Sequence, residues 1–517
     1  MAKKQLAPEW FGEMRRLYGR CQFLAAGDVY DEAVESGASP AYEAQLLAAR
    51  ILLKRDENRA VAFLIRRPPK ANAPRERAEW ALLLGIGYAR MRDFERADHH
   101  FEMVRGLARS PADKASLSYQ LARRSMLAGE LADARGHAGE MHCDHSLGAR
   151  IKRELLESFI FSHEERYLEC AESTIRALDL IGEHRAGYLE EWFHAVHNIA
   201  VLGRELPMPE AADVARAEVE ADVEWPPDLA IQHFQALKAV GWSCALRGDL
   251  LGCFRYLRAA ERTRPSPAFE AIVLLDRAYF ARILGERNWA CDEIEKAEVL
   301  FDRIDWNEAP GDERIGLLLM AEAIVDASPE KAHYFLARFN GLDKMRSPFA
   351  LFAFDQRCEA YAAYCEGFVR LESGEGGAEE PLRKAWALFD RIGYDWRAGR
   401  TALRLAEATG KERWRHLAED KLEQYPRSWL AREIVAQAAP SVPPVKLPRM
   451  QRTVLEMLCR KMTTAQIAQD LGLSQHTVRN HLKAVFRAYQ VNNRAALVAE
   501  VASRGDVPIA AARPSQV

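Results

Sequence analysis

The sequence predicts an all-α protein with a long helical-repeat body and a small C-terminal helical domain, and three observations support this. The chain has 517 residues, too many for a single hydrophobic core, which stops growing near roughly 250 to 300 residues. From about residue 10 to 436, apolar residues recur at helical spacing, and alternating runs of strand type are almost absent. Residues 446–517 carry 11 Lys and Arg against 4 Asp and Glu, a net charge of +7, which leaves −10 for residues 1–445.

Residues 1–437 form the expected body, in which several turns are followed by helices of the same kind. Phe94, Leu131 and Leu250 each follow a turn and precede a small residue by three positions, and Tyr167 and Trp289 fit the pattern more loosely. The intervals are 37, 36, 83 (close to twice 41) and 39 residues. This pattern resembles tetratricopeptide-type helical repeats, which recur about every 34 residues, and it predicts a solenoid of helix hairpins. A non-repeating bundle is the competing interpretation for any single segment.

A proline-rich segment at residues 438–447 separates this body from the C-terminal domain. Prolines stand at positions 440, 443, 444 and 448, and such spacing favours an extended polyproline II path over a helix. We therefore expect a semi-rigid linker, then a domain over residues 448–504, and a flexible tail over 505–517.

The C-terminal domain is predicted to contain four helices. The first runs from Pro448 to Cys459, and the second extends through Leu471 with Thr464 as its N-cap. Gly472 then provides a left-handed helix end, and Ser474 caps the third helix. The fourth helix opens at Asn493. Helix, four-residue turn and helix in this order are typical of a helix-turn-helix unit.

At 100° per residue, the third helix has two opposite faces. Val478, Leu482, Val485 and Tyr489 lie on one face, and the basic and amide side chains of Arg479, Asn480, Lys483, His476 and Arg487 lie on the other. A helix in a DNA major groove needs such a polar face, because Arg, Lys and Asn can bond the base edges. Thr477 and His481, on the flank, suit phosphate contacts, as do Ser474, His476 and Arg487.

Several motifs together carry a family resemblance. Pro448-Arg449, Thr464 to Ala468, Leu471-Gly-Leu-Ser474, Thr477 to Leu482 and Val491 to Ala495 closely resemble the LuxR-type (NarL/FixJ, GerE) DNA-binding domain. The resemblance implies base reading by Arg479, Asn480 and Lys483, and a last helix that dimerises on DNA. The apolar residues Leu497, Val498 and Val501 of that helix are the expected dimer contact. One departure is Met450, where the family usually has an acidic residue after Pro-Arg.

The sequence contains no signature of an enzyme or of a bound cofactor. No phosphate-binding glycine loop or nucleophile elbow occurs, so no catalytic residue and no cofactor are expected. His137, His142, Cys143 and His145 lie close together, but their spacing matches no zinc site and favours a polar hairpin surface, so no metal is expected. Apolar runs are too short for a membrane span, and the N-terminus lacks the apolar part of a signal peptide, which predicts a cytoplasmic protein.

These observations predict a cytoplasmic bacterial transcription regulator, in which the repeat body senses a protein, peptide or small-molecule signal and controls the helix-turn-helix. Its expected partners are double-stranded DNA, a second copy of the chain and an effector on the body, with RNA polymerase as a further candidate. The alternative is a repeat scaffold whose C-terminal helices bind a protein partner.

Overall fold

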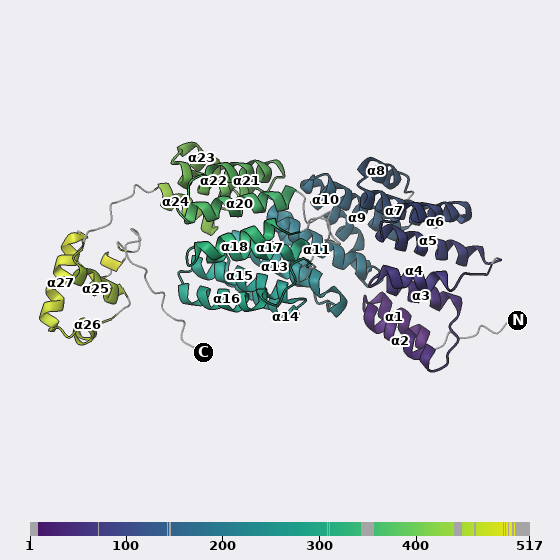
Figure 1. Cartoon of the computed structure of the whole chain (residues 1–517), viewed down its shortest axis with the longest axis horizontal. Coiled ribbons are helices and arrows are strands. Elements are labelled where there is room, and N and C mark those ends of the chain that lie inside the picture. Colours follow the sequence, from purple (N-terminus) through teal and green to yellow (C-terminus); the bar gives the residue numbers. More distant parts are fainter. Residues whose placement is uncertain are drawn as a thin grey trace.

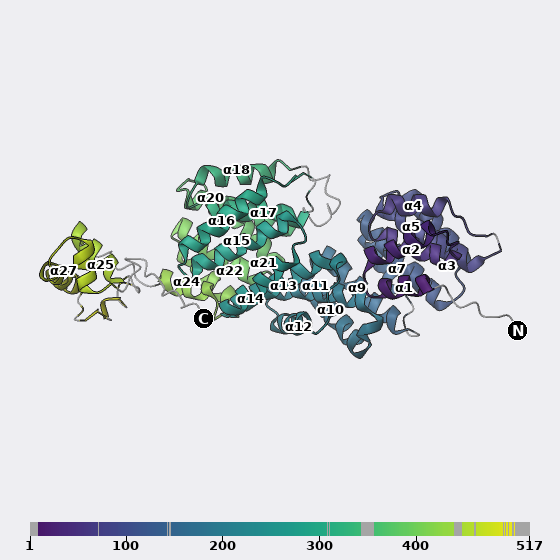
Figure 2. The same cartoon turned by 90° about the horizontal axis from the view of Figure 1, so that it is seen from below.

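The computed structural model describes residues 9–70, 72–141, 143, 146–307, 309, 311–342, 356–438, 447–459, 462–489, 491, 493–494, 496–498 and 501. Every regular element within these residues is a helix, which confirms the all-α fold class. Figures 1 and 2 show antiparallel hairpins stacked along the chain, and a small domain of α25 to α27 beside the end of the array.

The helical-repeat body consists of consecutive helix pairs, each packed as a hairpin. The pairs are α1 (Glu9–Gly19) with α2 (Phe23–Glu35), α3 (Tyr42–Leu53) with α4 (Glu57–Ile65), α5 (Pro74–Arg90) with α6 (Phe94–Leu107), α7 (Pro111–Ala128) with α8 (Leu131–Gly139), α9 (Leu147–His163) with α10 (Tyr167–Ile181), α11 (Leu189–Glu205) with α12 (Pro209–Val219), α13 (Ala230–Leu246) with α14 (Leu250–Thr263), α15 (Pro267–Ile283) with α16 (Arg287–Phe301), α17 (Gly311–Ile324) with α18 (Pro329–Asn340), α20 (Gln356–Glu372) with α21 (Glu379–Arg391), and α22 (Asp395–Thr409) with α23 (Glu412–Leu422). Helix α24 (Trp429–Ala438) packs on α23, and two short 3-10 helices, Gly182–Gly187 and Pro227–Leu229, join other pairs.

The repeat is more regular in the structure than in the sequence pattern. In the first nine pairs the second helix begins at positions 23, 57, 94, 131, 167, 209, 250, 287 and 329, at intervals of 34 to 42 residues. Three residues after each start lies a small buried residue: Ala26, Ala60, Ala97, Ala134, Cys170, Ala212, Cys253, Ala290 and Ala332. The predicted tetratricopeptide-like solenoid is confirmed. Trp289 was placed two residues late, because α16 begins at Arg287.

Six of these hairpins share one turn. The residue two positions before the second helix is left-handed, and it is glycine at Gly129, Gly248 and Gly285 but a larger residue at Cys21, Arg92 and Glu165. The amide that follows it donates to the carbonyl five residues earlier, at 2.8 to 3.0 Å. This is the hydrogen bond of a Schellman helix end. A helix can therefore end and its partner begin within about three residues.

The later part of the array curves back on itself. Arg397 of α22 donates from Nε and Nη2 to the carboxylate of Glu205 in α11, at 2.5 and 2.8 Å, across 192 residues of sequence. Trp429 of α24 donates from Nε1 to the hydroxyl of Tyr279 in α15, at 3.0 Å. Figure 1 shows the green helices α20 to α24 beside the teal helices α13 to α18. Helices α9, α10, α11, α13, α15, α17, α20, α21, α22 and α24 line a cavity of about 1050 Å³, here called the central cavity.

Two further features of the described residues concern membrane spans and metal sites. None of the described helices combines the length and apolar character needed to cross a bilayer. In the described part of the chain no three His, Cys, Asp or Glu side chains gather as metal ligands would. Cys143 is buried, and its thiol donates to the carbonyls of Met141 and Ala149. His142 and His145 lie outside the described residues.

Candidate nucleic-acid interface

Three helices form the core of the C-terminal domain. They are α25 (Arg449–Cys459), α26 (Thr464–Asp470) and α27 (Gln475–Ala488), and each contacts the other two. Helical residues 494, 496–498 and 501 add the start of a fourth helix. Their buried side chains form one apolar cluster: Val454, Leu455, Leu458, Cys459, Ile467, Ala468, Val478, Leu482, Val485, Tyr489, Leu497 and Val501. Burial raises the pKa of the Cys459 thiol, as expected for a core cysteine.

Local hydrogen bonds fix the two helices of the helix-turn-helix. Gly472 is left-handed, with φ of +64°, and the amide of Leu473 donates to the carbonyl of Ala468 at 2.9 Å. Ser474 caps α27 as predicted, since its hydroxyl accepts from the amide of Thr477 at 3.0 Å. The predicted cap of α26 was one residue late. Thr463, not Thr464, is the N-cap, and it forms a reciprocal capping box with Gln466.

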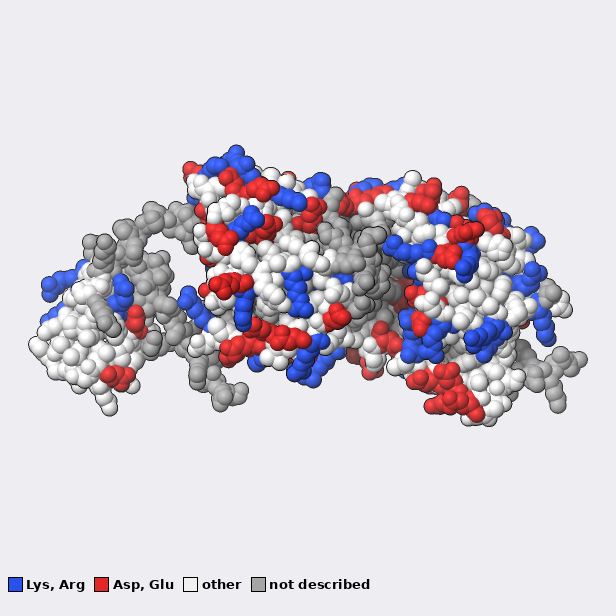
Figure 3. All heavy atoms as spheres, in the orientation of Figure 1, with Lys and Arg blue, Asp and Glu red and all other residues white. Residues whose placement is uncertain are grey.

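The outward face of α27 carries the predicted base-reading residues. Arg479, Asn480 and Lys483 are all exposed, whereas Val478 and Leu482, each directly before one of them, are buried. Among the described residues, none makes a hydrogen bond or ion pair with the side chains of these three. The arrangement leaves two cations and an amide free to meet an external polyanion. Figure 3 shows Lys and Arg at the outer edge of the domain, against mixed charges on the body.

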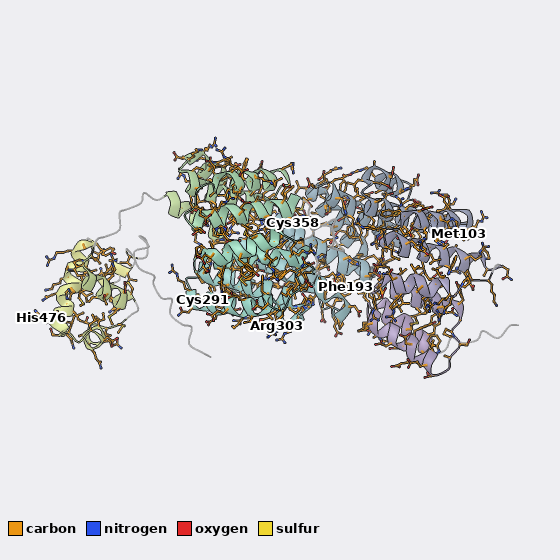
Figure 4. The ribbon with its side chains drawn as sticks, in the orientation of Figure 1. Met103, Phe193, Cys291, Arg303, Cys358 and His476 are labelled. Carbon is orange, nitrogen blue, oxygen red and sulfur yellow. The ribbon has the colours of Figure 1, made fainter. Side chains whose placement is uncertain are left out.

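The flanking residues surround this row. His476, labelled at the outer edge of the domain in Figure 4, and Arg487 are exposed, and Thr477 and His481 are half-buried. The structure adds Gln475, which the sequence analysis did not single out. Gln475 is exposed and is the first residue of α27, and the first residues of such helices are the ones that contact base edges. Its position directly after the Ser474 cap was the available signal.

The argument for the predicted dimer contact was wrong for two of its three residues. It assumed that the apolar stripe of the fourth helix is not needed by the core, but Leu497 and Val501 are fully buried in that core. A domain this small has little apolar surface to bury, and two side chains of the fourth helix add to its core. Val498 is only half-buried, so it alone of the three reaches the surface.

Arg494 is a structural residue that sequence reasoning left without a role. Its Nη2 donates to the carbonyls of Leu458 and Met462, at 3.1 and 2.9 Å. These carbonyls lie at the end of α25 and before α26, so one guanidinium joins the fourth helix to both. Charge-assisted bonds of this kind are stronger than neutral ones. Arg494 therefore orients the fourth helix.

Comparisons with known proteins agree with this geometry. Residues 446–501 match the family described as "Bacterial regulatory proteins, luxR family". The "Spore germination protein GerE" of Bacillus subtilis (strain 168) is 33% identical over 63 residues, which span 12% of this chain and 85% of that protein. A solved structure, "Crystal structure of APC/C hetero-tetramer Cut9-Hcn1", covers 95% of this chain and 89% of its own, with 14% identity and a TM-score of 0.35. A TM-score below 0.5 does not establish a shared fold, so the fold of the body is assigned from its own helix hairpins. By its C-terminal helix-turn-helix domain, the chain belongs to the LuxR family of bacterial regulatory proteins.

Proposed function

We propose that the protein is a sequence-specific transcription regulator that reads bases with Arg479, Asn480 and Lys483. The observation that carries this proposal is the exposed and unpaired row of these side chains on α27, opposite a buried apolar face. Ser474, His476, Thr477, His481 and Arg487 flank the row and would bind phosphates. The unit comprises residues 448–504, joined to the body (1–437) by residues 438–447 and followed by the tail 505–517. It acts in the cytoplasm, on double-stranded DNA.

The test compares two arginine variants on an operator found by genome-wide mapping of bound DNA. Arg479→Ala should weaken binding by about 1 to 3 kcal/mol and relax the preference at one base position. Arg452→Ala is the matched control, because Arg452 is exposed on α25 and not on α27. It removes the same charge without removing a base contact, so sequence preference should not change. Full affinity and unchanged preference in Arg479→Ala would contradict the assignment.

Salt dependence separates this function from the scaffold alternative. Phosphate contacts on duplex DNA give a slope of roughly −0.9 per neutralised phosphate in a plot of log affinity against log salt. Binding measured by fluorescence anisotropy at several salt concentrations should show a steep slope that becomes less steep in Arg487→Ala. A flat slope, together with affinity for a protein such as RNA polymerase, would favour the scaffold.

We also propose that two chains bind one operator and that the operator sequence is an inverted repeat. Because Leu497 and Val501 are core residues, the contact must centre on Val498. Val498→Asp should reduce the two-chain complex on DNA by at least about tenfold while the domain stays folded. Leu497→Asp should instead unfold the domain, because it buries a charge. A footprint on one asymmetric half-site, with one chain per duplex by sedimentation, would contradict the dimer.

The body is proposed to control the domain in response to an effector. The supporting observation is the division of charge, +7 for residues 446–517 and −10 for the rest. Exposed charges are screened beyond about 8 Å at physiological salt, so control requires docking. Docking would lower apparent affinity for DNA by the undocked fraction. A fragment starting near Ser441, fused to a neutral dimerising module, should then bind the operator more tightly than the whole chain. Equal affinity without effector would mean that the body recruits or dimerises instead.

A further inference from the structure

The central cavity of the body is a space of a size suited to a ligand. Its volume of about 1050 Å³ lies at the upper end of the roughly 300 to 1,000 Å³ found for small-molecule sites. Its walls come from helices far apart in the sequence, from α9 to α24. The curvature of helical-repeat arrays commonly creates such concave binding surfaces. Cys358 of α20, labelled in Figure 4, lies in this wall.

The charges that line the cavity are predominantly positive. Eight lining side chains are basic and four are acidic, an excess of four. The basic ones are Arg204, Lys238, Arg282, Arg357, Arg397, Arg400, Arg404 and Arg432, and the acidic ones are Glu205, Asp276, Glu322 and Glu433. Two further carboxylates, of Asp326 and Glu407, pair with Arg282 and Arg404 from outside the lining, so part of this positive excess is neutralised. The rest of the body is acidic, so the basic lining is a local property of the cavity.

Three of these arginines form a row along one helix. Arg397, Arg400 and Arg404 stand at i, i+3 and i+7 on α22, which places them on one face. All three line the cavity, and Arg400 is 6% exposed. Glu205, Glu322 and Glu433 hold them in place from α11, α17 and α24. A row of oriented guanidinium groups in a site of low dielectric is suited to bind a carboxylate, sulfate or phosphate group.

Unpaired donors point to the same class of ligand. Among the described side chains that line the cavity, five donors have a buried atom without an acceptor: Arg204 Nε, Trp242 Nε1, Tyr364 Oη, Arg400 Nε and Arg404 Nε. Among the described lining residues, Asp276 Oδ2 is the one buried acceptor without a hydrogen bond, and it forms an ion pair with Lys238, whose Nζ lies 3.3 Å away. Buried donors without a partner are costly, and an unexplained one commonly marks a missing partner. These atoms are shielded from solvent, so a ligand rich in acceptor oxygens would reach them only after the side chains rotate.

The part of the lining next to this row is aromatic. The rings of Trp242 and Tyr279 stack, with centroids 5.5 Å apart, and the ring of Trp429 lies 5.9 Å from that of Tyr279. Arg400 of the basic row contacts these rings, because its guanidinium lies 5.0 Å from the ring centre of Tyr279 and 4.8 Å from that of Tyr364. The basic row and the aromatic surface are therefore adjacent. One compact molecule could contact both.

From this geometry we propose that the central cavity binds a small amphipathic anion, with a flat apolar body against Trp242, Tyr279 and Trp429 and an acidic group against Arg400 and Arg404. The ligand's identity as the regulatory signal rests on the proposed control of DNA binding by the body. The binding site itself does not depend on that control.

The test uses a matched pair of fluorescent probes on the full-length protein. Anilinonaphthalene sulfonate has a flat apolar body and one sulfonate, and phenylnaphthylamine has the same ring system without the charge. The sulfonate should lower the dissociation constant by about tenfold or more relative to the neutral probe, the gain expected for one charge-assisted contact. Energy transfer from tryptophan should accompany binding, because Trp242 and Trp429 line the cavity. Equal affinity for the two probes would overturn the proposal.

Variants locate the binding in the cavity. Arg400 and Glu322 form a buried pair, so they are neutralised together in Arg400→Gln/Glu322→Gln, which leaves no unpaired buried charge. This variant should bind the sulfonate about tenfold more weakly and the neutral probe within about twofold. Arg391→Gln is the control, because Arg391 is exposed on α21 and does not line the cavity. Arg432→Gln, at an exposed lining residue, should weaken sulfonate binding even if the double variant does not fold.

The outcomes separate the ligand site from the control of DNA binding. Unchanged sulfonate affinity in a folded double variant, or in Arg432→Gln should the double variant not fold, would overturn the site. Operator affinity is measured in parallel, with and without saturating sulfonate. If the probe binds in the cavity but operator affinity changes by less than about twofold, the site stands and the proposed control by this class of ligand fails.

Discussion

Neutralising the buried carboxylate of Glu205 should strongly destabilise the body. Its side chain is 1% exposed and accepts from both Nε and Nη2 of Arg397. Arg204 Nη2 lies 2.6 Å from Glu205 Oε1, and the Tyr361 hydroxyl donates to the same oxygen at 3.2 Å. In Glu205→Gln the guanidinium groups of Arg204 and Arg397 lose the buried carboxylate with which both pair. Removing one partner of a buried pair costs about 3 to 5 kcal/mol.

The pKa of Glu205 leads to a similar magnitude. Burial acts to raise this pKa, but Arg204, Arg397 and the hydrogen bond from Tyr361 outweigh it and lower the pKa from 4.5 to about 2. At about 1.4 kcal/mol per pKa unit, this difference corresponds to about 3 kcal/mol. Because the folded pKa is lowered, the stabilisation is present above about pH 4.5 and is lost as the pH falls through about 2.

Thermal unfolding followed by circular dichroism tests this reasoning. At about 2 to 4 °C per kcal/mol for a cooperative unit of about 150 to 250 residues, Tm should fall by about 6 to 12 °C at neutral pH. The difference from the unmodified protein should shrink between about pH 4.5 and pH 2. Glu32→Gln is the control, because Glu32 is exposed on α2 and should leave Tm unchanged. A Tm within about 2 °C of the unmodified protein, or a difference that does not depend on pH, would refute the reasoning.

Two further predictions concern backbone geometry and the C-terminal domain. Gly248→Ala should cost about 1 to 3 kcal/mol in urea unfolding, because φ is +87° and the new Cβ would lie 2.7 Å from the carbonyl oxygen of Arg427. Gly129→Ala, with φ of +82° and no atom within 4 Å of the new Cβ, should cost only the conformational part. Equal costs in the two variants would show that the contact with Arg427 is unimportant. Arg494→Met should cost about 2 to 4 kcal/mol by leaving two carbonyls unpaired, seen in the full chain as lost hydrogen-exchange protection over residues 447–501. Arg479→Met, on the outer face, should keep that protection, and protection retained in both would contradict the role of Arg494.

Much of the C-terminal domain could be predicted from sequence because its signals are local. Ser474 as a cap, Gly472 as a left-handed end, and the division of α27 into a face with Val478 and a face with Arg479 all depend on neighbours within a turn or two. The error of one residue at Thr463 came from two adjacent threonines, either of which can cap. The repeat of the body was detected for the same reason, since each hairpin carries its own turn and small residue.

What only the tertiary structure decided depends on residues far apart in the chain. Local periodicity places Leu497 on an apolar helix face. It does not show whether that face packs on the domain's own core or on a second chain. The pairing of Glu205 with Arg397 joins positions 192 residues apart, and nothing near either residue in the sequence announces the other. The sequence alone determined the all-α class, the hairpins and the outward face of α27, because helices follow from local spacing. The central cavity follows from the small rotation between successive hairpins, summed from α9 to α24, and that sum exists only in the folded array.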